Sequence, residues 1–421
     1  MKRWIVLVLL ASLCLPVFGN ASQEGGAGGK LVLWDKSEYV AAYNEASKAR
    51  IETFGRNNNV EVEYVIVPPN DLQAKLLAAI EARNPPDIVV TDDFLAKRFA
   101  GMDQLVDVSD ILKSVKFTKA SLDLAYIQGG NFLVPLTVFP AGRYLRKDVW
   151  DAKGLPYPTT WQQIYDQAKI VNDPARDFYA LGYPMGASGG GDAESMVRSV
   201  ILSHGGIPVD KDGKVTINSR QTLEALNFIV KLFKEGLCPP SAITWDDMGN
   251  NTAYLAGSVG TIFNTPSVFN QARNDNPELY KNTLIMAYPA GPVGQFCLLG
   301  GNAVIIFKNG KATAAAKKYI IDFFEINFYK DLILKMGGMW MPVVEGADND
   351  PFWALPENKG WLDNAKIGVP TTYPAPANDL TAGAFAGQFC VKAVQRIVLQ
   401  NQDPQQSLNQ LEKDLKQALN Q

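Results

Sequence analysis

Between residues 30 and 94, short apolar runs alternate with segments of helical periodicity, and this alternation limits the fold more than any other feature. The apolar runs occupy residues 31–34, 60–67 and 87–91. Between them, residues 39–57 and 71–82 place apolar side chains at helical spacing. Strand–helix–strand–helix–strand with short connections predicts a parallel sheet covered by helices on both faces. We therefore expect an α/β fold.

Polar residues follow two strands of this expected sheet. Trp34, Asp35 and Lys36 end the first strand, and Asp92 and Asp93 end the third. In such sheets ligands bind beyond the carboxyl ends of the strands. The sequence therefore predicts that these five residues border a binding site. Core packing of Trp34, and capping of the next helix by one of the two aspartates, are the structural alternatives.

The rest of the chain is long enough for a second core. Strands are expected at residues 131–138 and 303–307, and helices at 161–171, 192–204, 222–235, 312–329 and 407–419. A threonine pair before residue 161 and a glycine at 236 act as helix boundary signals. With 421 residues the chain exceeds one typical core, so two domains or lobes are expected.

The first residues have the pattern of a secretory signal peptide. Lys2 and Arg3 give a positive start, and residues 4–13 form an apolar run that only Ser12 interrupts. That run is too short to span a membrane, which needs about 20 residues. We expect a signal peptide at residues 1–21 and a periplasmic protein.

Residues 22–29 are rich in glycine and are expected to form a flexible tether before the fold. Cys14 lies in a segment that loosely resembles a lipobox, so anchoring through a lipid on this cysteine remains the alternative to ordinary cleavage. Three further cysteines, Cys238, Cys297 and Cys390, lie far apart in the sequence. We expect buried free thiols, because an exported protein of this size does not need disulfides.

The composition argues against several classes of function. The 40 basic and 43 acidic side chains give a net charge of −3, which offers no electrostatic surface for nucleic acid. One histidine, His204, and scattered cysteines provide no recognisable zinc site or catalytic triad. We therefore expect no metal, no cofactor and no enzymatic activity. A glycosidase, which needs only two carboxylates, remains the alternative, with Asp92 or Asp93 paired to Asp246.

Several short motifs follow one another in a recognisable order. They are Asn-Pro-Pro-Asp-Ile-Val at 84–89, Tyr-Leu-Arg-Lys-Asp-Val-Trp at 144–150, Gly-Leu-Pro-Tyr-Pro-Thr-Thr-Trp at 154–161, Tyr-Leu-Ala-Gly-Ser at 254–258, Asn-Thr-Pro at 264–266, Leu-Gly-Gly-Asn at 299–302, and Gly-Gly-Met-Trp-Met-Pro at 337–342. In this order the chain resembles the extracellular solute-binding proteins of the maltose-binding-protein superfamily, specifically their sugar-binding members. The second and third motifs are the most specific part of the resemblance.

The resemblance implies a two-lobed periplasmic-binding-protein fold of type II. Each lobe would be a mostly parallel sheet flanked by helices, with the ligand cleft between the lobes. The expected lobes are residues 30–138 plus 295–343, and residues 139–294 plus 344–421. Closure of the lobes by hinge bending would deliver a sugar to the membrane permease of an ABC importer. We expect a monomeric receptor.

The resemblance also implies binding residues from the later parts of the chain. Small polar groups would face the cleft at Asn264, Thr265, Gly301 and Asn302. Phe139 would lie near the first crossing between the lobes. Trp340 is a candidate to stack on a sugar ring, with filling of the gap between the lobes as its alternative. Trp245 and Asp246 lie in a loop that closes over the ligand or stays solvated.

The cargo is the least constrained part of this interpretation. Asn302 and Ser267 stand where many sugar-binding members carry aromatic residues, which leaves the identity of the sugar open. Receptors for a polyol, a phosphorylated polyol or a polyamine are the alternatives of the same class. The carboxylates Asp35, Asp92, Asp93 and Asp246 would suit a polyamine. A carbohydrate-processing enzyme is the alternative from another class.

Overall fold

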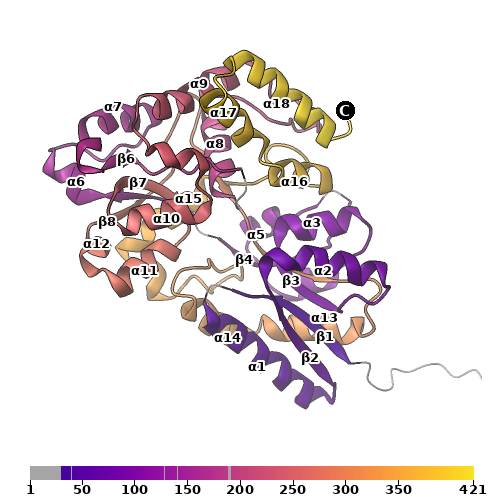
Figure 1. Cartoon of the computed structure of the whole chain (residues 1–421). Helices are drawn as coiled ribbons and strands as arrows, with labels where there is room; N and C mark the ends of the chain where they lie inside the picture. The colour runs from indigo at the N-terminus through magenta and orange to yellow at the C-terminus, as the bar shows by residue number, and fades with distance from the viewer. Residues whose placement is uncertain (1–29, 39, 128, 140, 188–190) are drawn as a thin grey trace, which may run out of the picture.

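The computed structural model of the chain describes residues 30–38, 40–127, 129–139, 141–187 and 191–421. These residues form two lobes joined by several passages of the chain (Figure 1). The expected signal peptide at 1–21, the tether at 22–29 and Cys14 lie outside the described residues. None of the described helices combines the length and the apolar character that a membrane crossing needs.

The first lobe is built on a five-stranded sheet. Its strand order is β2 (Val62–Val67), β1 (Leu31–Lys36), β3 (Ile88–Asp92), β10 (Gly301–Ile306) and β4 (Val134–Val138). Strand β1 pairs in parallel with β2 and β3, with α1 (Ala41–Asn58) and α2 (Pro69–Glu81) in the connections. The parallel unit expected from the first part of the sequence is thus present, and β10 joins it antiparallel to β3 and β4.

The burial of β3 on both faces explains why the sequence is continuously apolar at residues 88–90. Ile88 and Val90 belong to one hydrophobic core, whereas Val89 belongs to another. Successive side chains of a strand point to opposite faces of the sheet. Because helices cover both faces, all three side chains are buried, which is the usual pattern of parallel strands.

The second lobe contains a four-stranded sheet in the order β6 (Tyr179–Leu181), β7 (Val259–Asn264), β5 (Gly142–Arg146) and β8 (Thr283–Met286). Only β6 and β7 are parallel; β5 is antiparallel to both β7 and β8. The expected mostly parallel sheet is therefore not found in this lobe. The reason is that β5 begins at the crossing between the lobes, whereas β7 ends there, so the two strands run in opposite directions.

Three passages of the chain connect the lobes. Strand β4 ends at Val138 and β5 begins at Gly142. Strand β9 (Cys297–Leu299) pairs with β11 (Gly368–Pro370) and leads directly into β10. Met341 exchanges backbone hydrogen bonds with Val138. Backbone pairing with the first lobe continues to Glu345, whose N–H donates to Lys116, so the lobe ranges expected from the sequence stay a prediction.

A helical contact also bridges the lobes. In the first lobe, α3 (Asp93–Gly101) follows β3, and it packs against α16 (Asp379–Ala386). Arg198 of α8 (Asp192–Ser203) ties α16 to the second lobe by donating to the carbonyl of Ala384 at 2.9 Å. The packing is close, because a Cβ on Gly101 would lie 2.4 Å from the Cβ of Asp379.

The expected single helix at 312–329 is two helices. They are α13 (Thr313–Phe323) and α14 (Ile326–Lys335). The side chain of Glu325 accepts the backbone N–H groups of Asn327 and Phe328, at 3.1 and 3.0 Å. This carboxylate therefore caps a new helix start, and apolar periodicity alone does not reveal the break.

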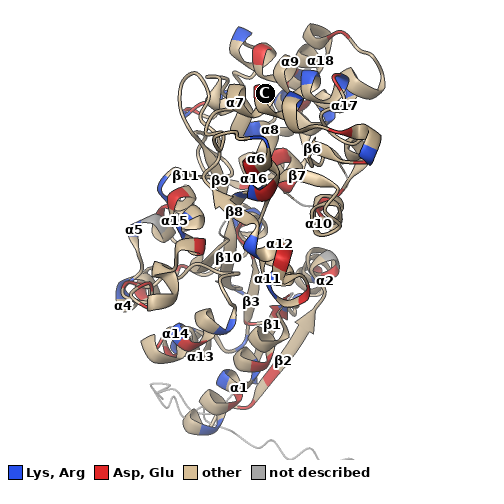
Figure 2. Cartoon of the chain, turned by 90° about the vertical axis from the view of Figure 1, so that its left-hand side faces the viewer, with Lys and Arg blue, Asp and Glu red and all other residues tan. Residues whose placement is uncertain are grey.

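Other local predictions are confirmed. Helix α7 (Trp161–Val171) has the predicted bounds, and the hydroxyl of Thr160 caps it by accepting from the N–H of Gln163 at 3.1 Å. Cys238, Cys297 and Cys390 are free and buried. Acidic and basic residues are interspersed over both lobes (Figure 2).

Candidate functional site

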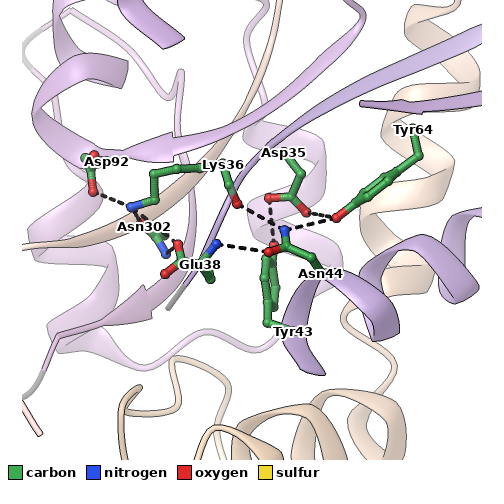
Figure 3. A network of polar contacts seen from close by, with 8 residues as sticks. All are labelled: Asp35, Lys36, Glu38, Tyr43, Asn44, Tyr64, Asp92 and Asn302. Atoms are coloured by element: carbon green, nitrogen blue, oxygen red, sulfur yellow. Dashed lines mark hydrogen bonds and ion pairs between the residues drawn. The ribbon is translucent and has the colours of Figure 1, made fainter. Parts of the chain in front are cut away.

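The ammonium of Lys36 is the centre of a polar network at the end of the first-lobe sheet (Figure 3). Its Nζ lies 2.7 Å from a carboxylate oxygen of Asp92, 2.8 Å from the amide oxygen of Asn302 and 3.3 Å from Glu38. Sheet topology creates this cluster. Strands β1 and β3 end at the same edge, and the antiparallel register of β10 places Asn302 opposite Asp92.

Asn302 links the ammonium of Lys36 to the carboxylate of Glu38. Its amide oxygen accepts from Lys36, while its NH₂ group donates to Glu38 at 2.9 Å. Burial lowers the pKa of Lys36, but the nearby carboxylates of Asp92 and Glu38 outweigh burial and raise it above its ordinary value. Lys36 is therefore a cation, and the ring of Phe139 lies 5.5 Å from its Nζ. The sequence placed four of these five residues in the site and missed Glu38.

Asp35 points away from this network into the first lobe. It is fully buried and accepts hydrogen bonds from Ser47 at 2.9 Å, Tyr64 at 2.8 Å and Tyr43 at 3.3 Å. Burial raises its pKa to about 7. The alternation of a strand explains the difference from Lys36. The structure argues against the expected contact of Asp35 with a ligand.

Two further residues expected in the site lie in the interior instead. Trp340 is 1% exposed and meets Tyr43 edge-on, with ring centroids 4.5 Å apart. Its indole therefore has no free face for a sugar ring. A Cβ on Gly301 would lie 1.9 Å from the carbonyl oxygen of Thr137, so this glycine serves the close approach of β10 and β4. The structure argues against direct binding roles for Trp340 and Gly301.

Trp34 and Asp93 border the cluster without joining it. Trp34 is half-buried and packs against the core on the face of β1 opposite to Asp35. Asp93 begins α3 and pairs at 2.7 Å with Lys97, whose side chain is fully buried. This pair also lies on the first turn of α3, where a negative charge interacts favourably with the helix dipole. Neither aspartate caps α3 through a side-chain hydrogen bond, so the capping alternative from the sequence is wrong, and Asp93 holds Lys97 instead.

The second lobe contributes a cavity of about 270 Å³ whose lining combines polar and apolar side chains. Its lining side chains come from the starts of α8, α10 (Asp247–Leu255) and α11 (Ser267–Asp275), and from the end of β7. They are Asp192, Asp247, Met248, Asn251, Asn264, Thr265, Ser267, Gln271 and Met339. Met339 belongs to the segment that pairs with the first lobe, so both lobes border the cavity.

Two carboxylates lie together in this cavity. Asp247 accepts the backbone N–H of Asp192 at 3.3 Å. Asp192 accepts from the side-chain amides of Asn250 at 3.1 Å and Asn264 at 3.5 Å. Burial and repulsion by Asp247 raise the pKa of Asp192 well above its ordinary value, and burial also raises the pKa of Asp247. Ionisation of one carboxylate therefore disfavours ionisation of the other.

The register of the strands brings the two clusters to one cleft. Asn302 pairs with Thr137 near the end of β4, and Asn264 pairs with Gly142 at the start of β5. Four peptide links, from Val138 to Gly142, span at most about 14 Å. The Lys36 network and the cavity therefore lie on either side of the same crossing.

Trp245 and Asp246 lie beside the cavity rather than in it. They line a separate depression of about 450 Å³ along α10, which shares Met248 with the cavity. The indole of Trp245 donates to Ser241 at 3.1 Å, and Asp246 caps α10 by accepting the N–H of Met248 at 3.0 Å. The next residue, Asp247, is the one that reaches the cavity.

The sequence analysis missed several residues that the structure brings to the cleft. Glu38 follows β1 by two positions, and that proximity was the available signal. Asp192 is only the first residue of an expected helix in the sequence, whereas in the structure it begins α8 beside the cavity. No group of three or more potential metal ligands occurs among the described residues. His204 ends α8, and its Nδ1 lies 2.8 Å from the carbonyl of Val200.

Residues 36–324 match the family model described as bacterial extracellular solute-binding protein. YcjN of Escherichia coli (strain K12), a candidate ABC transporter periplasmic-binding protein, is 24% identical over 329 residues, which covers 74% of this chain and 73% of that protein. The diacetylchitobiose binding protein DasA of Streptomyces coelicolor is 23% identical over 197 residues, covering 46% of this chain and 44% of that protein.

Solved structures share the fold over nearly the whole chain. A sugar transporter from Arthrobacter chlorophenolicus A6 with bound laminaribiose superposes with a TM-score of 0.78 at 19% identity, covering 92% of this chain and 99% of that chain. Maltose-bound MalE3 of T. maritima superposes with a TM-score of 0.77 at 20% identity, covering 93% of this chain and 99% of that chain. These likenesses establish the two-lobed architecture.

Proposed function

Because this chain belongs to the bacterial extracellular solute-binding proteins, we propose that it captures a sugar or oligosaccharide and delivers it to an ABC importer. The observation that carries this proposal is the pair of polar clusters on either side of the crossing between the lobes. Both consist of the groups that sugar hydroxyls require, because carboxylates and amides accept and donate hydrogen bonds in fixed directions. Their position allows one ligand to contact both lobes.

The first lobe would hold the ligand through the network around Lys36. Asp92 is the most accessible member, with a side chain that is 25% exposed, and it would accept from a hydroxyl. The ring of Phe139 would offer an apolar surface to the C–H face of a sugar. Asn302 and Glu38 would act mainly by holding the ammonium and the carboxylate in place.

The second lobe would supply neutral partners as well as acids. The hydroxyls of Thr265 and Ser267 and the amide of Asn251 line the cavity beside Asp192 and Asp247. A ligand bound to both walls would favour the closed arrangement, because it gains contacts there that neither lobe offers alone. Hinge bending at the passages between the lobes would then present a closed receptor to the permease.

A phosphorylated cargo fits these residues poorly. Among the described residues, Lys36 is the only basic residue of the two clusters, and oxygens of Asp92, Asn302 and Glu38 already surround its ammonium. A phosphate needs free cationic or N–H donors. The names of relatives and neighbours, which include an ABC transporter component and structures with bound neutral disaccharides, favour a neutral sugar over a phosphorylated one.

Export and partners complete the proposal. We infer a signal peptide at residues 1–21, with a lipid on Cys14 as the alternative, and a monomeric receptor that meets the permease subunits of an importer. The family description, bacterial extracellular, supports a location outside the cytoplasm. Mass spectrometry of the N-terminus of the exported protein distinguishes ordinary cleavage from lipidation.

A ligand screen tests the proposed function. Native mass spectrometry of freshly purified protein identifies any bound solute, and a thermal-shift panel of sugars, polyols, glycerol phosphate and spermidine then ranks classes. A ligand at a hundredfold excess over its Kd stabilises the protein by about 2.7 kcal/mol. We expect saccharides to raise the melting temperature. A shift with spermidine or glycerol phosphate and with no saccharide would refute the sugar assignment, and cleavage of an oligosaccharide would indicate an enzyme.

A further inference from the structure

Asp192 and Asp247 form a carboxylate pair that has no basic partner. Asp247 accepts the N–H of Asp192 at 3.3 Å, and the two amides on Asp192 belong to neutral asparagines. No lysine or arginine lines the cavity in the described part of the chain. The pair therefore has hydrogen-bonding support from the protein, including backbone N–H groups at the start of α8, but no basic side chain among the described residues that line the cavity.

The opposite side of the cleft does not supply the missing charge. Lys36 is its one cation, and it already lies within 3.3 Å of both Asp92 and Glu38. The two clusters together thus contain four carboxylates and one ammonium. Two half-buried carboxylates without a basic partner repel each other, so this balance favours a ligand that brings a positive charge of its own.

An ammonium group would interact with this pair more strongly than a neutral hydroxyl. Burial and mutual repulsion raise the pKa of Asp192, which means that the empty pair tends to retain a proton. A cation between the carboxylates lets both ionise, and charge-assisted hydrogen bonds are about twice as strong as neutral ones. A carboxylate or phosphate on the ligand would instead be repelled.

The rest of the cavity suits a sugar ring rather than a linear amine. Asn251, Thr265 and Ser267 offer hydroxyls and amides for ring hydroxyls, and the larger, apolar part of the lining, which includes Met248 and Met339, suits the C–H faces of a ring. No aromatic side chain lines the cavity in the described residues, so the methylene chain of a polyamine would lack a flat apolar wall.

We propose that the cavity recognises a saccharide with a free amine, and that Asp192 and Asp247 receive its ammonium group. This inference rests on the proposed function and specifies the ligand class for the same cleft. Asp247 would be the main determinant of specificity, because Asp192 is already held by Asn250 and Asn264.

Titration calorimetry with three β-1,4-linked disaccharides tests the inference on the whole mature chain. The probes are the glucosamine disaccharide, its N-acetylated form and the glucose disaccharide, which differ only at position 2 of each ring. The free amine is expected to bind about tenfold more tightly than either neutral form. In Asp247→Asn this ratio is expected to fall to within about threefold.

Asp246→Asn is the matched control. It removes the same charge one residue earlier, and asparagine is as good a helix cap as aspartate, so the preference should persist. If the neutral disaccharides bind as tightly as the amine in the wild type, or if Asp247→Asn keeps the preference, the inference is overturned while the sugar receptor stands. Failure of all saccharides to bind would overturn both.

Discussion

The ammonium of Lys36 lies 2.7 Å from the carboxylate of Asp92, although 56 positions separate the two residues in the chain. Adjacent parallel strands end at the same edge of the sheet, and this places β1 and β3 side by side at the cleft. The two residues therefore depend on the sheet for their contact rather than on a local motif. Asn302 completes the arrangement from an antiparallel strand that enters from the other lobe.

Replacing Trp340 is expected to affect stability rather than recognition. The indole is buried against Tyr43, and large-to-small substitutions of buried aromatic residues cost about 3–5 kcal/mol. Trp340→Ala should lower the free energy of unfolding in urea by that amount, with affinity for the ligand retained in the folded fraction. Trp245→Ala, at a half-buried tryptophan, is the control and should cost less. Normal stability with lost binding would restore the stacking role expected from the sequence.

Much of the fold could be predicted from the sequence because its signals are local. The strand–helix alternation before residue 94 and the cap at Thr160 are examples, and both are present in the structure. The antiparallel course of β5 could not be predicted from apolar runs, because it depends on where the chain crosses between the lobes. The break at Glu325 depends on a side-chain cap within an apolar periodicity.

The site was predictable only in part. Lys36 and Asp92 were predicted because the carboxyl edge of a parallel sheet is a general binding position, whereas Asn302 was expected only from the resemblance. The direction of a side chain at that edge was not predictable in the same way. Asp35 points inwards and Lys36 towards the cleft, although they are neighbours in the chain. Asp192 and Asp247 meet only through the packing of α8 and α10.

The buried carboxyl group of Asp35 is expected to make stability depend on pH. Burial raises its pKa from 3.8 to about 7, so the folded protein holds this proton more tightly than the unfolded chain. The contribution of Asp35 to the free energy of unfolding is therefore most favourable below about pH 4. It becomes less favourable as the pH rises to about 7, by about 4 kcal/mol at most. Urea unfolding of the wild type and Asp35→Asn from pH 4 to 8 should show a flatter profile in the variant.

Asp71→Asn provides the control for that comparison. The side chain of Asp71 is exposed, and its partner Lys75 lies 3.7 Å away, so its removal should leave the profile close to that of the wild type. Other buried carboxyl groups contribute to both curves, and the difference between them isolates Asp35. Parallel profiles for the wild type and Asp35→Asn would contradict the assignment.

The contact between α3 and α16 is expected to influence affinity from a distance. Gly101→Ala places a Cβ 2.4 Å from the Cβ of Asp379, so the helices must separate. Overpacking costs about 1–3 kcal/mol. If the α3–α16 contact forms when the lobes close on the ligand, this cost destabilises the closed state, and the ligand should bind about tenfold less tightly. Calorimetry measures the affinity, and small-angle scattering measures the radius of gyration, which should increase.

A second substitution, at Asp379, tests whether the effect of Gly101→Ala comes from this steric clash. Adding Asp379→Gly to Gly101→Ala removes the opposing Cβ and should recover most of the affinity. Unchanged affinity and an unchanged radius of gyration in Gly101→Ala would show that this contact does not bear on closure.

Titration calorimetry on one variant in each lobe tests most directly whether both lobes hold the sugar. The ligand is the saccharide that binds most tightly in the thermal-shift panel. A single ligand held by both walls predicts one site per chain, with weaker binding in each variant. Asp92→Asn removes a charged acceptor and should cost about 1.5–3 kcal/mol, whereas Thr265→Val removes a neutral hydroxyl and should cost about 1 kcal/mol. Asp71→Asn should bind like the wild type. Wild-type affinity in either the Asp92 or the Thr265 variant would contradict a sugar held between the two lobes.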